Sequence, residues 1–221
     1  MKLKQILLFV ISFFLLWTGA WILHNLLTET IWQALEDSEN HNMLYWAVMK
    51  TCIWIIFPFF YAKQIFKLHV IKKFFGIQNL KKGIIFGVIA SIIWIISSYF
   101  VESMKASQVI FSFATSFTFF WVITGTPIAE EFTFRGVIQP ALQKSGISFW
   151  YVNIITSIVF LLMHCLGWAF QGVLQNNLFS ISAISILLVS LIAGWLRHKS
   201  DSLYSSIIFH SVNNFFASII S

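Results

Sequence analysis

Two adjacent glutamates and an arginine lie close together in an otherwise apolar stretch, at Glu130, Glu131 and Arg135. Residues four apart in an α-helix share a face, so Glu131 and Arg135 can form an ion pair. Glu130 is rotated by about 100° from its neighbour and is left without that partner. The spacing therefore predicts that Glu131 has a structural role and that Glu130 is free for acid–base chemistry. The alternative is a simple cluster of charges at the end of a helix.

Further polar residues occur in two later apolar segments. His164 follows Phe160 by four residues, which places an imidazole and an aromatic ring on one helical face. His210 and Asn214 have the same spacing. A lone histidine in an apolar helix is usually a packing residue. A carboxylate, two imidazoles and an amide together, however, are the groups needed to activate water and to stabilise an oxyanion.

These residues lie in a chain with the composition of a membrane protein. Of its 221 residues, 58% are apolar and 10% are charged, whereas soluble domains are about 45–50% apolar and about 25% charged. Seven spans of about 20 residues would use about 140 residues and leave too few for a separate soluble domain. The sequence therefore predicts an all-α, polytopic transmembrane bundle that forms a single domain over residues 1–221.

Seven apolar runs are predicted to span the membrane. They cover about 6–27, 43–62, 83–101, 107–123, 149–168, a sixth run that ends at Trp195, and 203–220. The segment Thr124-Gly125-Thr126-Pro127 is expected to interrupt or kink the helix there. A re-entrant or interfacial helix over about 127–144 would make eight helices without changing the topology.

Charged residues separate along the chain and predict its orientation. The basic inter-span segment contains Lys63, Lys67, Lys72, Lys73, Lys81 and Lys82, and the preceding acidic segment contains Glu29, Glu36, Asp37 and Glu39. The positive-inside rule then places the amino terminus and the basic segment in the cytoplasm. The net charge of +6 therefore indicates contact with anionic membrane lipid and not with nucleic acid. A short chain rich in Ile, Phe, Lys and Asn favours a bacterial plasma membrane.

Several other chemistries are disfavoured by the residues present. The chain has no His-Glu-x-x-His pair, which excludes a zincin-type site on one helix. Its two aspartates, Asp37 and Asp201, lie outside the span interiors, which disfavours an aspartyl dyad. Cys52 and Cys165 lie in apolar runs and are expected to be buried free thiols.

The motifs Glu130-Glu131-x-x-x-Arg135, Phe160-x-x-x-His164 and His210-x-x-x-Asn214 resemble, in this order and beside Gly136, those of the CPBP family. This family comprises type II CAAX prenyl endopeptidases, bacteriocin-processing and immunity proteins, and Abi proteins. The resemblance covers about residues 119–216, which would form the catalytic core.

The resemblance implies a membrane-embedded endopeptidase whose intramembrane cavity faces the cytoplasm. Its substrate would be a lipidated protein of the CAAX type or a peptide precursor. By position, Glu130 would be the general base that activates water, assisted by His164. His210 and Asn214 would stabilise the oxyanion, and the predicted ion pair would orient the site.

A zinc site is the alternative to direct activation of water. Glu130, His164 and His210 could supply three ligands and leave a fourth position open. A zinc-bound histidine usually has its second nitrogen held by a carboxylate or a carbonyl, and Glu131 is expected to be committed to Arg135. We therefore favour catalysis without a metal.

Two non-enzymatic readings remain. One is a bacteriocin self-immunity protein of the same fold, which would act without proteolysis. The other is a small transporter that uses Glu130 and His164 as a proton relay, but transporters usually show inverted repeats or paired broken helices, and the sequence shows neither. Straight, untilted spans would place Glu130 and the two histidines about 10 Å or more apart in depth. Tilt, a break at Pro127 or a cone-shaped wet chamber would have to close that gap.

Overall fold

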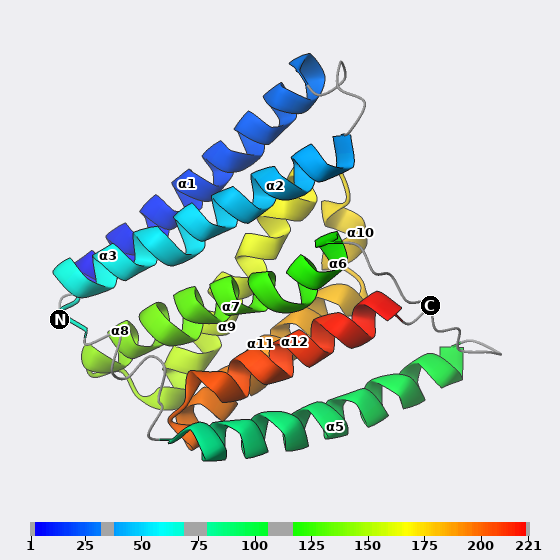
Figure 1. Cartoon of the computed structure of the whole chain (residues 1–221). Coiled ribbons are helices and arrows are strands. Elements are labelled where there is room, and N and C mark those ends of the chain that lie inside the picture. Colours follow the sequence, from blue (N-terminus) through cyan, green and yellow to red (C-terminus); the bar gives the residue numbers. More distant parts are fainter. Residues whose placement is uncertain (1–2, 32–37, 69–78, 106–116, 220–221) are drawn as a thin grey trace.

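The computed structural model describes residues 3–31, 38–68, 79–105 and 117–219, and every regular element within them is helical (Figure 1). Four helical segments are uninterrupted long helices, two are built from several α and π pieces, and the others are shorter. In chain order the elements are α1 (Leu3–Thr30), α2 (Ser38–Lys50), η2 (Thr51–Ile56), α3 (Phe57–Gln64), α5 (Leu80–Lys105), α6 (Phe117–Phe120), η4 (Trp121–Gly125), α7 (Thr126–Glu131), η5 (Phe132–Ile138), α8 (Gln139–Lys144), α9 (Phe149–Phe170), α10 (Leu174–Leu178), α11 (Ile181–Ser200) and α12 (Leu203–Ile219). Elements marked η are π-helical, and α2–η2–α3 and α6–η4–α7–η5–α8 each run as one continuous helix.

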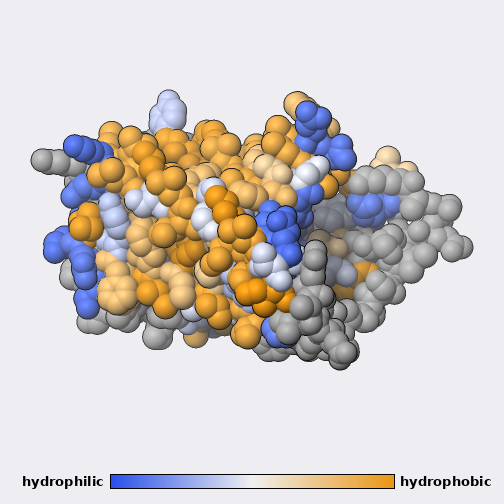
Figure 2. Space-filling view, turned by 90° about the horizontal axis from the view of Figure 1, so that it is seen from above, coloured by the Kyte–Doolittle hydropathy of each residue, from blue (hydrophilic) through white to orange (hydrophobic). Residues whose placement is uncertain are grey.

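Five helices of the described residues are long and apolar enough to cross a membrane. They cover Leu3–Thr30, His41–Gln64, Leu80–Met104, Phe149–Phe170 and Ile181–Ser200. The chain is therefore a polytopic helical membrane protein, as its composition predicts. Figure 2 shows a broad hydrophobic band across the surface, with hydrophilic residues mainly toward its ends.

The five spans differ from the seven that the sequence predicts. The α6–α8 helix carries Glu130, Glu131 and Arg135, and these charges lower its hydropathy. α12 has 17 residues, about 25 Å of helix, which is shorter than the roughly 30 Å hydrocarbon core. The predicted start of the fourth span at Ser107 lies outside the described residues.

Each of the three prolines is the second residue after a π-helical stretch. Pro58 follows η2, Pro127 follows η4 and Pro140 follows η5. A proline ring clashes with the carbonyl four residues earlier and lacks a donor, and a widened turn relieves both problems without ending the helix. The predicted interruption at Thr124–Pro127 is therefore absent, because the helix passes through this segment with a wider turn.

The helices alternate in direction, so their ends gather at two ends of the bundle (Figure 1). At one end, Lys144 Nζ on α8 donates to the carbonyl of Phe66 at 3.1 Å, and Phe149 stacks on His198 with ring centroids 3.8 Å apart. We call this the basic end. Its described cationic residues are Lys4, Lys63, Lys67, Lys81, Lys82, Lys144, Arg197 and Lys199.

At the end of the bundle opposite the basic end, α1 contacts α2 and α9. His24 Nε2 lies 2.8 Å from Asn42 Oδ1, and Trp21 stacks on Phe170 with centroids 5.7 Å apart. Glu29 lies in the last turn of α1 at this end. The described residues therefore reproduce the separation of charge that the sequence predicts. Lys72, Lys73, Glu36 and Asp37 lie outside the described residues, as does the side chain of Glu39.

An aromatic core surrounds the η5 segment. Phe13 packs edge-on against Trp54 at 4.9 Å, and Phe134 packs edge-on against Phe160 at 5.0 Å. Most residues of η5 and α8 are buried, so the helix that carries the glutamates lies at the centre of the bundle. This central position brings the glutamates within reach of side chains from α2, α9, α11 and α12.

The two cysteines are free thiols, as predicted, but they are not buried. Cys52 is exposed and Cys165 is partly exposed. Both lie on outward faces of their helices. The prediction of burial was wrong because, in a membrane protein, apolar outward faces contact lipid instead of a protein core.

Candidate active site

The ion pair predicted from the spacing of Glu131 and Arg135 is present. Arg135 Nη1 donates to Glu131 Oε1 at 3.0 Å, and both side chains are almost completely buried. Arg135 Nη2 donates to the carbonyl and the hydroxyl oxygens of Ser190, each at 2.7 Å. A buried charge must be paired and hydrogen-bonded to be tolerated. The pair therefore ties the central helix to α11.

His210 lies between the two glutamates. Its Nδ1 donates to Glu131 Oε1 at 2.9 Å, and its Nε2 lies 3.7 Å from Glu130 Oε2. With the proton on Nδ1, Nε2 of the neutral ring is an acceptor that faces Glu130. Glu131 thus orients His210 as well as pairing with Arg135, which the sequence analysis did not foresee.

Glu130 is not left without a partner. Lys50 Nζ lies 2.5 Å from Glu130 Oε1. Lys50 ends α2 within the span His41–Gln64, and its ammonium also lies 5.2 Å from the centroid of the Trp54 ring. Lys50 is not among the site residues predicted from the motifs, although a lone lysine inside an apolar run is a signal for a buried partner of opposite charge.

His164 faces the same region from α9. Its Nδ1 donates to the Phe160 carbonyl at 2.9 Å, which leaves Nε2 of the neutral ring free to accept a proton or a hydrogen bond. Phe160 packs against both imidazoles, with centroids 4.7 Å from His164 and 5.9 Å from His210. The two imidazoles, which straight spans would separate in depth, therefore contact the same phenylalanine.

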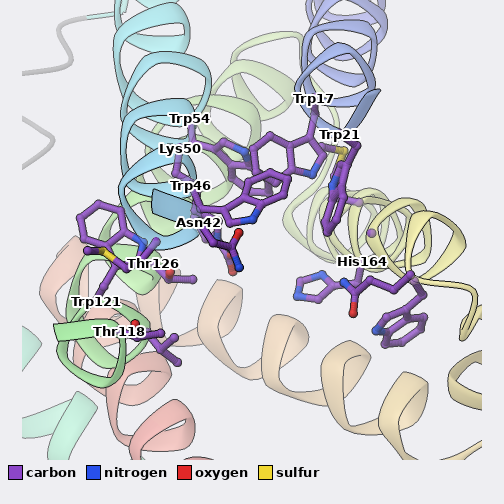
Figure 3. Close-up of a pocket in the computed structure, with 17 residues that line it drawn as sticks. Trp17, Trp21, Asn42, Trp46, Lys50, Trp54, Thr118, Trp121, Thr126 and His164 are labelled. Carbon is purple, nitrogen blue, oxygen red and sulfur yellow. The ribbon is translucent and has the colours of Figure 1, made fainter. Parts of the chain in front are cut away.

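A cavity of about 360 Å³ adjoins these groups (Figure 3). Its walls include Lys50, Glu130 and His164. Six tryptophans also line it, and these are Trp17, Trp21, Trp46, Trp54, Trp121 and Trp168. A mostly apolar cavity with a few convergent polar groups, in this size range, is typical of a small-molecule or peptide site.

Asn214 lies beside the site, where it caps a π turn. Its Nδ2 donates to the Val122 carbonyl at 3.0 Å. In η4 the N–H of Thr126 donates to the carbonyl of Trp121, five residues earlier. By the same spacing, the Val122 carbonyl would accept from the N–H of residue 127, but Pro127 has no N–H. The amide of Asn214 therefore satisfies a carbonyl that the proline leaves without a donor.

Only some of the predicted site residues are in contact with one another. Glu130, Glu131, Arg135 and His210 form one connected cluster of polar contacts, and Phe160 packs between His164 and this cluster. Asn214 is held at the π turn, and neither His210 nor Asn214 is among the residues that line the cavity.

The proposed zinc ligands do not fit a metal as they are placed. No three His, Cys, Asp or Glu side chains form a ligand group within the part of the chain that the structure describes. The Lys50 ammonium also occupies Oε1, one of the two carboxylate oxygens with which Glu130 could bind a dication. The expectation that pairing with Arg135 would keep Glu131 from orienting a histidine was nevertheless wrong, because Glu131 orients His210 in the way that zinc-binding histidines are oriented.

Comparison with known proteins agrees with the motifs. Residues 112–216 match the family model described as type II CAAX prenyl endopeptidase Rce1-like. No curated protein and no solved structure matches the chain. The matched region includes all six predicted site residues, whereas Lys50 and the tryptophans of α1 and α2 lie outside it.

Proposed function

We propose that this chain, which carries a type II CAAX prenyl endopeptidase Rce1-like domain over residues 112–216, is an intramembrane endopeptidase of the glutamate- and histidine-dependent type. One observation carries the proposal. The carboxylate of Glu130 and the imidazole of His164 line one cavity, and His210 lies 3.7 Å from the same carboxylate. A base and two imidazoles at an apolar cavity are what water activation requires.

In the proposed reaction, a water molecule binds between Glu130 and the free Nε2 of His164. Glu130 accepts a proton from the water while the hydroxide oxygen adds to the peptide carbonyl carbon. The electron pair moves to the carbonyl oxygen. Collapse of this intermediate breaks the C–N bond, and Glu130 returns its proton to the leaving amine. The products are a carboxylic acid and an amine, which become a carboxylate and an ammonium when the acid's proton passes to the amine.

The oxyanion has several candidate partners. His210 and Asn214 lie on successive turns of α12. Asn214 has a second N–H to donate to the oxyanion, whereas His210 would donate from Nε2 only with a proton on both ring nitrogens, because its Nδ1 proton is held by Glu131. Lys50 is the cation in the cavity wall. When Glu130 takes up a proton, negative charge passes to the carbonyl oxygen, and the flexible ammonium of Lys50 can follow it. Glu131 and Arg135 act indirectly, because they fix the ring of His210.

The substrate class follows from the cavity and the membrane setting. Its tryptophan walls favour an apolar or aromatic segment of a membrane-associated polypeptide, either a lipidated CAAX-type protein or a peptide precursor. The basic end supports a topology with the amino terminus in the cytoplasm of a bacterial plasma membrane, where it would contact anionic lipid. With the α6–α8 helix and α12 counted, the bundle would have seven spans.

One observation favours a second candidate, a non-proteolytic immunity protein of the same fold. Lys50 occupies the carboxylate that would have to activate water. If this ion pair does not open, the cavity binds a peptide without cleaving it.

The test is peptide cleavage by the purified protein in detergent. We expect the wild-type protein to cleave a fluorogenic farnesylated CAAX peptide or its unprenylated form, with one oxygen from ¹⁸O-labelled water in the new carboxylate. Glu130→Gln should be inactive, because an amide cannot accept the proton. Glu29→Gln, at an exposed position at the opposite end, is the matched control and should cleave normally. Unchanged cleavage by Glu130→Gln would refute the mechanism, and protection from a peptide toxin without any cleavage would favour the immunity protein.

A further inference from the structure

The cavity runs toward the end of the bundle that lies opposite the basic end. Its lining residues farthest from Glu130 along their helices are Asn42 near the start of α2, Thr118 in α6 and Gln171 just after α9. All three lie at the opposite end, where Asn42 contacts His24. The cavity therefore extends from Glu130 and Trp54 to that end of the bundle.

The route from the basic end is filled by side chains. Phe9 and Phe13 of α1 and Phe134 of η5 are completely buried. Further along the central helix, Val137 and Ala141 are also completely buried. None of these residues lines the cavity. Protein interiors are close-packed, so these buried side chains occupy the centre of the basic half among the residues that the structure describes.

Two expectations from the sequence are therefore incompatible. The basic residues place one end of the bundle in the cytoplasm, whereas the family resemblance implies a cavity that faces the cytoplasm. The cavity and the basic residues lie at different ends of the molecule. Only one of the two ends can be cytoplasmic.

We propose that the site is entered from the extracytoplasmic side, and that its substrate is an apolar polypeptide segment presented there, not a lipidated carboxyl terminus in the cytoplasm. The positive-inside rule decides between the two ends, because eight described cationic residues lie at the basic end. The tryptophan-lined wall then receives apolar side chains as the segment passes from the membrane surface toward Glu130. This inference rests on the proposed endopeptidase function.

The first experiment measures the side of entry in sealed vesicles. The probe is a fluorescence-quenched peptide with an apolar central segment and sulfonated ends, which cannot cross the membrane. We expect right-side-out vesicles to cleave it at their full detergent-permeabilised rate, and inside-out vesicles to cleave it only after detergent is added. The reverse pattern would overturn the proposal.

A second experiment determines the orientation of the protein in the membrane without measuring cleavage. In a background of Cys52→Ser and Cys165→Ser, we expect an impermeant maleimide to label Gln171→Cys in intact cells. Lys67→Cys, an exposed residue at the basic end, is the matched control and should be labelled only after permeabilisation. Labelling of Lys67→Cys alone would overturn the proposal.

The two experiments separate failure of this inference from failure of the proposed function. If the detergent-solubilised wild-type protein cleaves no peptide, the endopeptidase proposal fails, whatever the thiol labelling shows. If it cleaves but the cavity end labels from the cytoplasm, the endopeptidase proposal stands and the inferred side of entry is wrong. A bulky adduct on Gln171→Cys should also abolish most cleavage, whereas the same adduct on Lys67→Cys should not change it.

Discussion

His210 of α12 donates a 2.9 Å hydrogen bond from Nδ1 to Glu131 Oε1, the same oxygen that accepts a hydrogen bond from Arg135. One buried carboxylate oxygen therefore fixes both a cation on its own helix and an imidazole on another. This arrangement turns Nε2 of His210 toward Glu130. The second glutamate of the motif thus acts on the first through a histidine.

Loss of the Glu131 carboxylate should destabilise the protein as well as inactivate it. Glu131→Ala leaves Arg135 buried without its charge partner, and breaking a buried pair in this way costs about 3–5 kcal/mol. We expect a lower melting temperature in detergent, less folded protein and little cleavage. The control is Asp201→Asn, which removes the exposed pair with Arg197 and should change stability by about 0–1 kcal/mol. Equal melting temperatures for the two variants would contradict the structural role of Glu131.

Asn214 is expected to contribute to kcat and, separately, to the stability of the π turn. Asn214→Ala is expected to lower kcat by about 10²–10³-fold, the usual effect of losing an oxyanion donor, and to leave the Val122 carbonyl without a donor. Pro127→Ala supplies a backbone N–H near that carbonyl. The double variant should therefore regain thermal stability but not kcat. Recovery of kcat in the double variant would show that Asn214 is structural only.

Lys50 should matter through its charge. Lys50→Met removes the cation from the cavity and is expected to lower kcat by about 10²-fold, with a smaller change in KM. Lys50→Arg should retain part of the activity, because it keeps the positive charge. Lys82→Met is the matched control, since Lys82 also lies over an aromatic ring, 5.7 Å from the centroid of Phe86, but far along the chain from the cavity. A folded Lys50→Met protein with wild-type kcat would exclude Lys50 from the reaction.

Chelation should not remove the activity. Glu130 is paired with Lys50, and no three-ligand group is formed in the described segments, so water is expected to be activated without a bound cation. The measurement is cleavage after exhaustive dialysis against a chelator, together with elemental analysis of the purified protein. Near-stoichiometric zinc, with activity lost on chelation and restored by zinc, would show that the metal alternative is correct.

Features that depend on neighbours along one helix could be predicted from the sequence. Apolar composition and run length were sufficient for an all-α membrane bundle, because a chain in lipid must satisfy its backbone hydrogen bonds within helices. The pairing of Glu131 with Arg135 followed from a four-residue spacing, since helical geometry brings such residues together wherever the helix lies. The motif residues were found for the same reason.

Features that depend on how separate helices pack needed the tertiary structure. The partners of Glu130 and His210, namely Lys50 and Glu131, come from helices whose mutual rotation no local pattern specifies. Asn214 binds the Val122 carbonyl only because a proline and a π turn leave that carbonyl free. The sequence placed charge at one end of the bundle, but only packing shows that the basic half is filled with aromatic side chains and that the cavity reaches the other end. A cavity is the space that packed side chains leave unfilled, so its position is a property of all the contacting helices together.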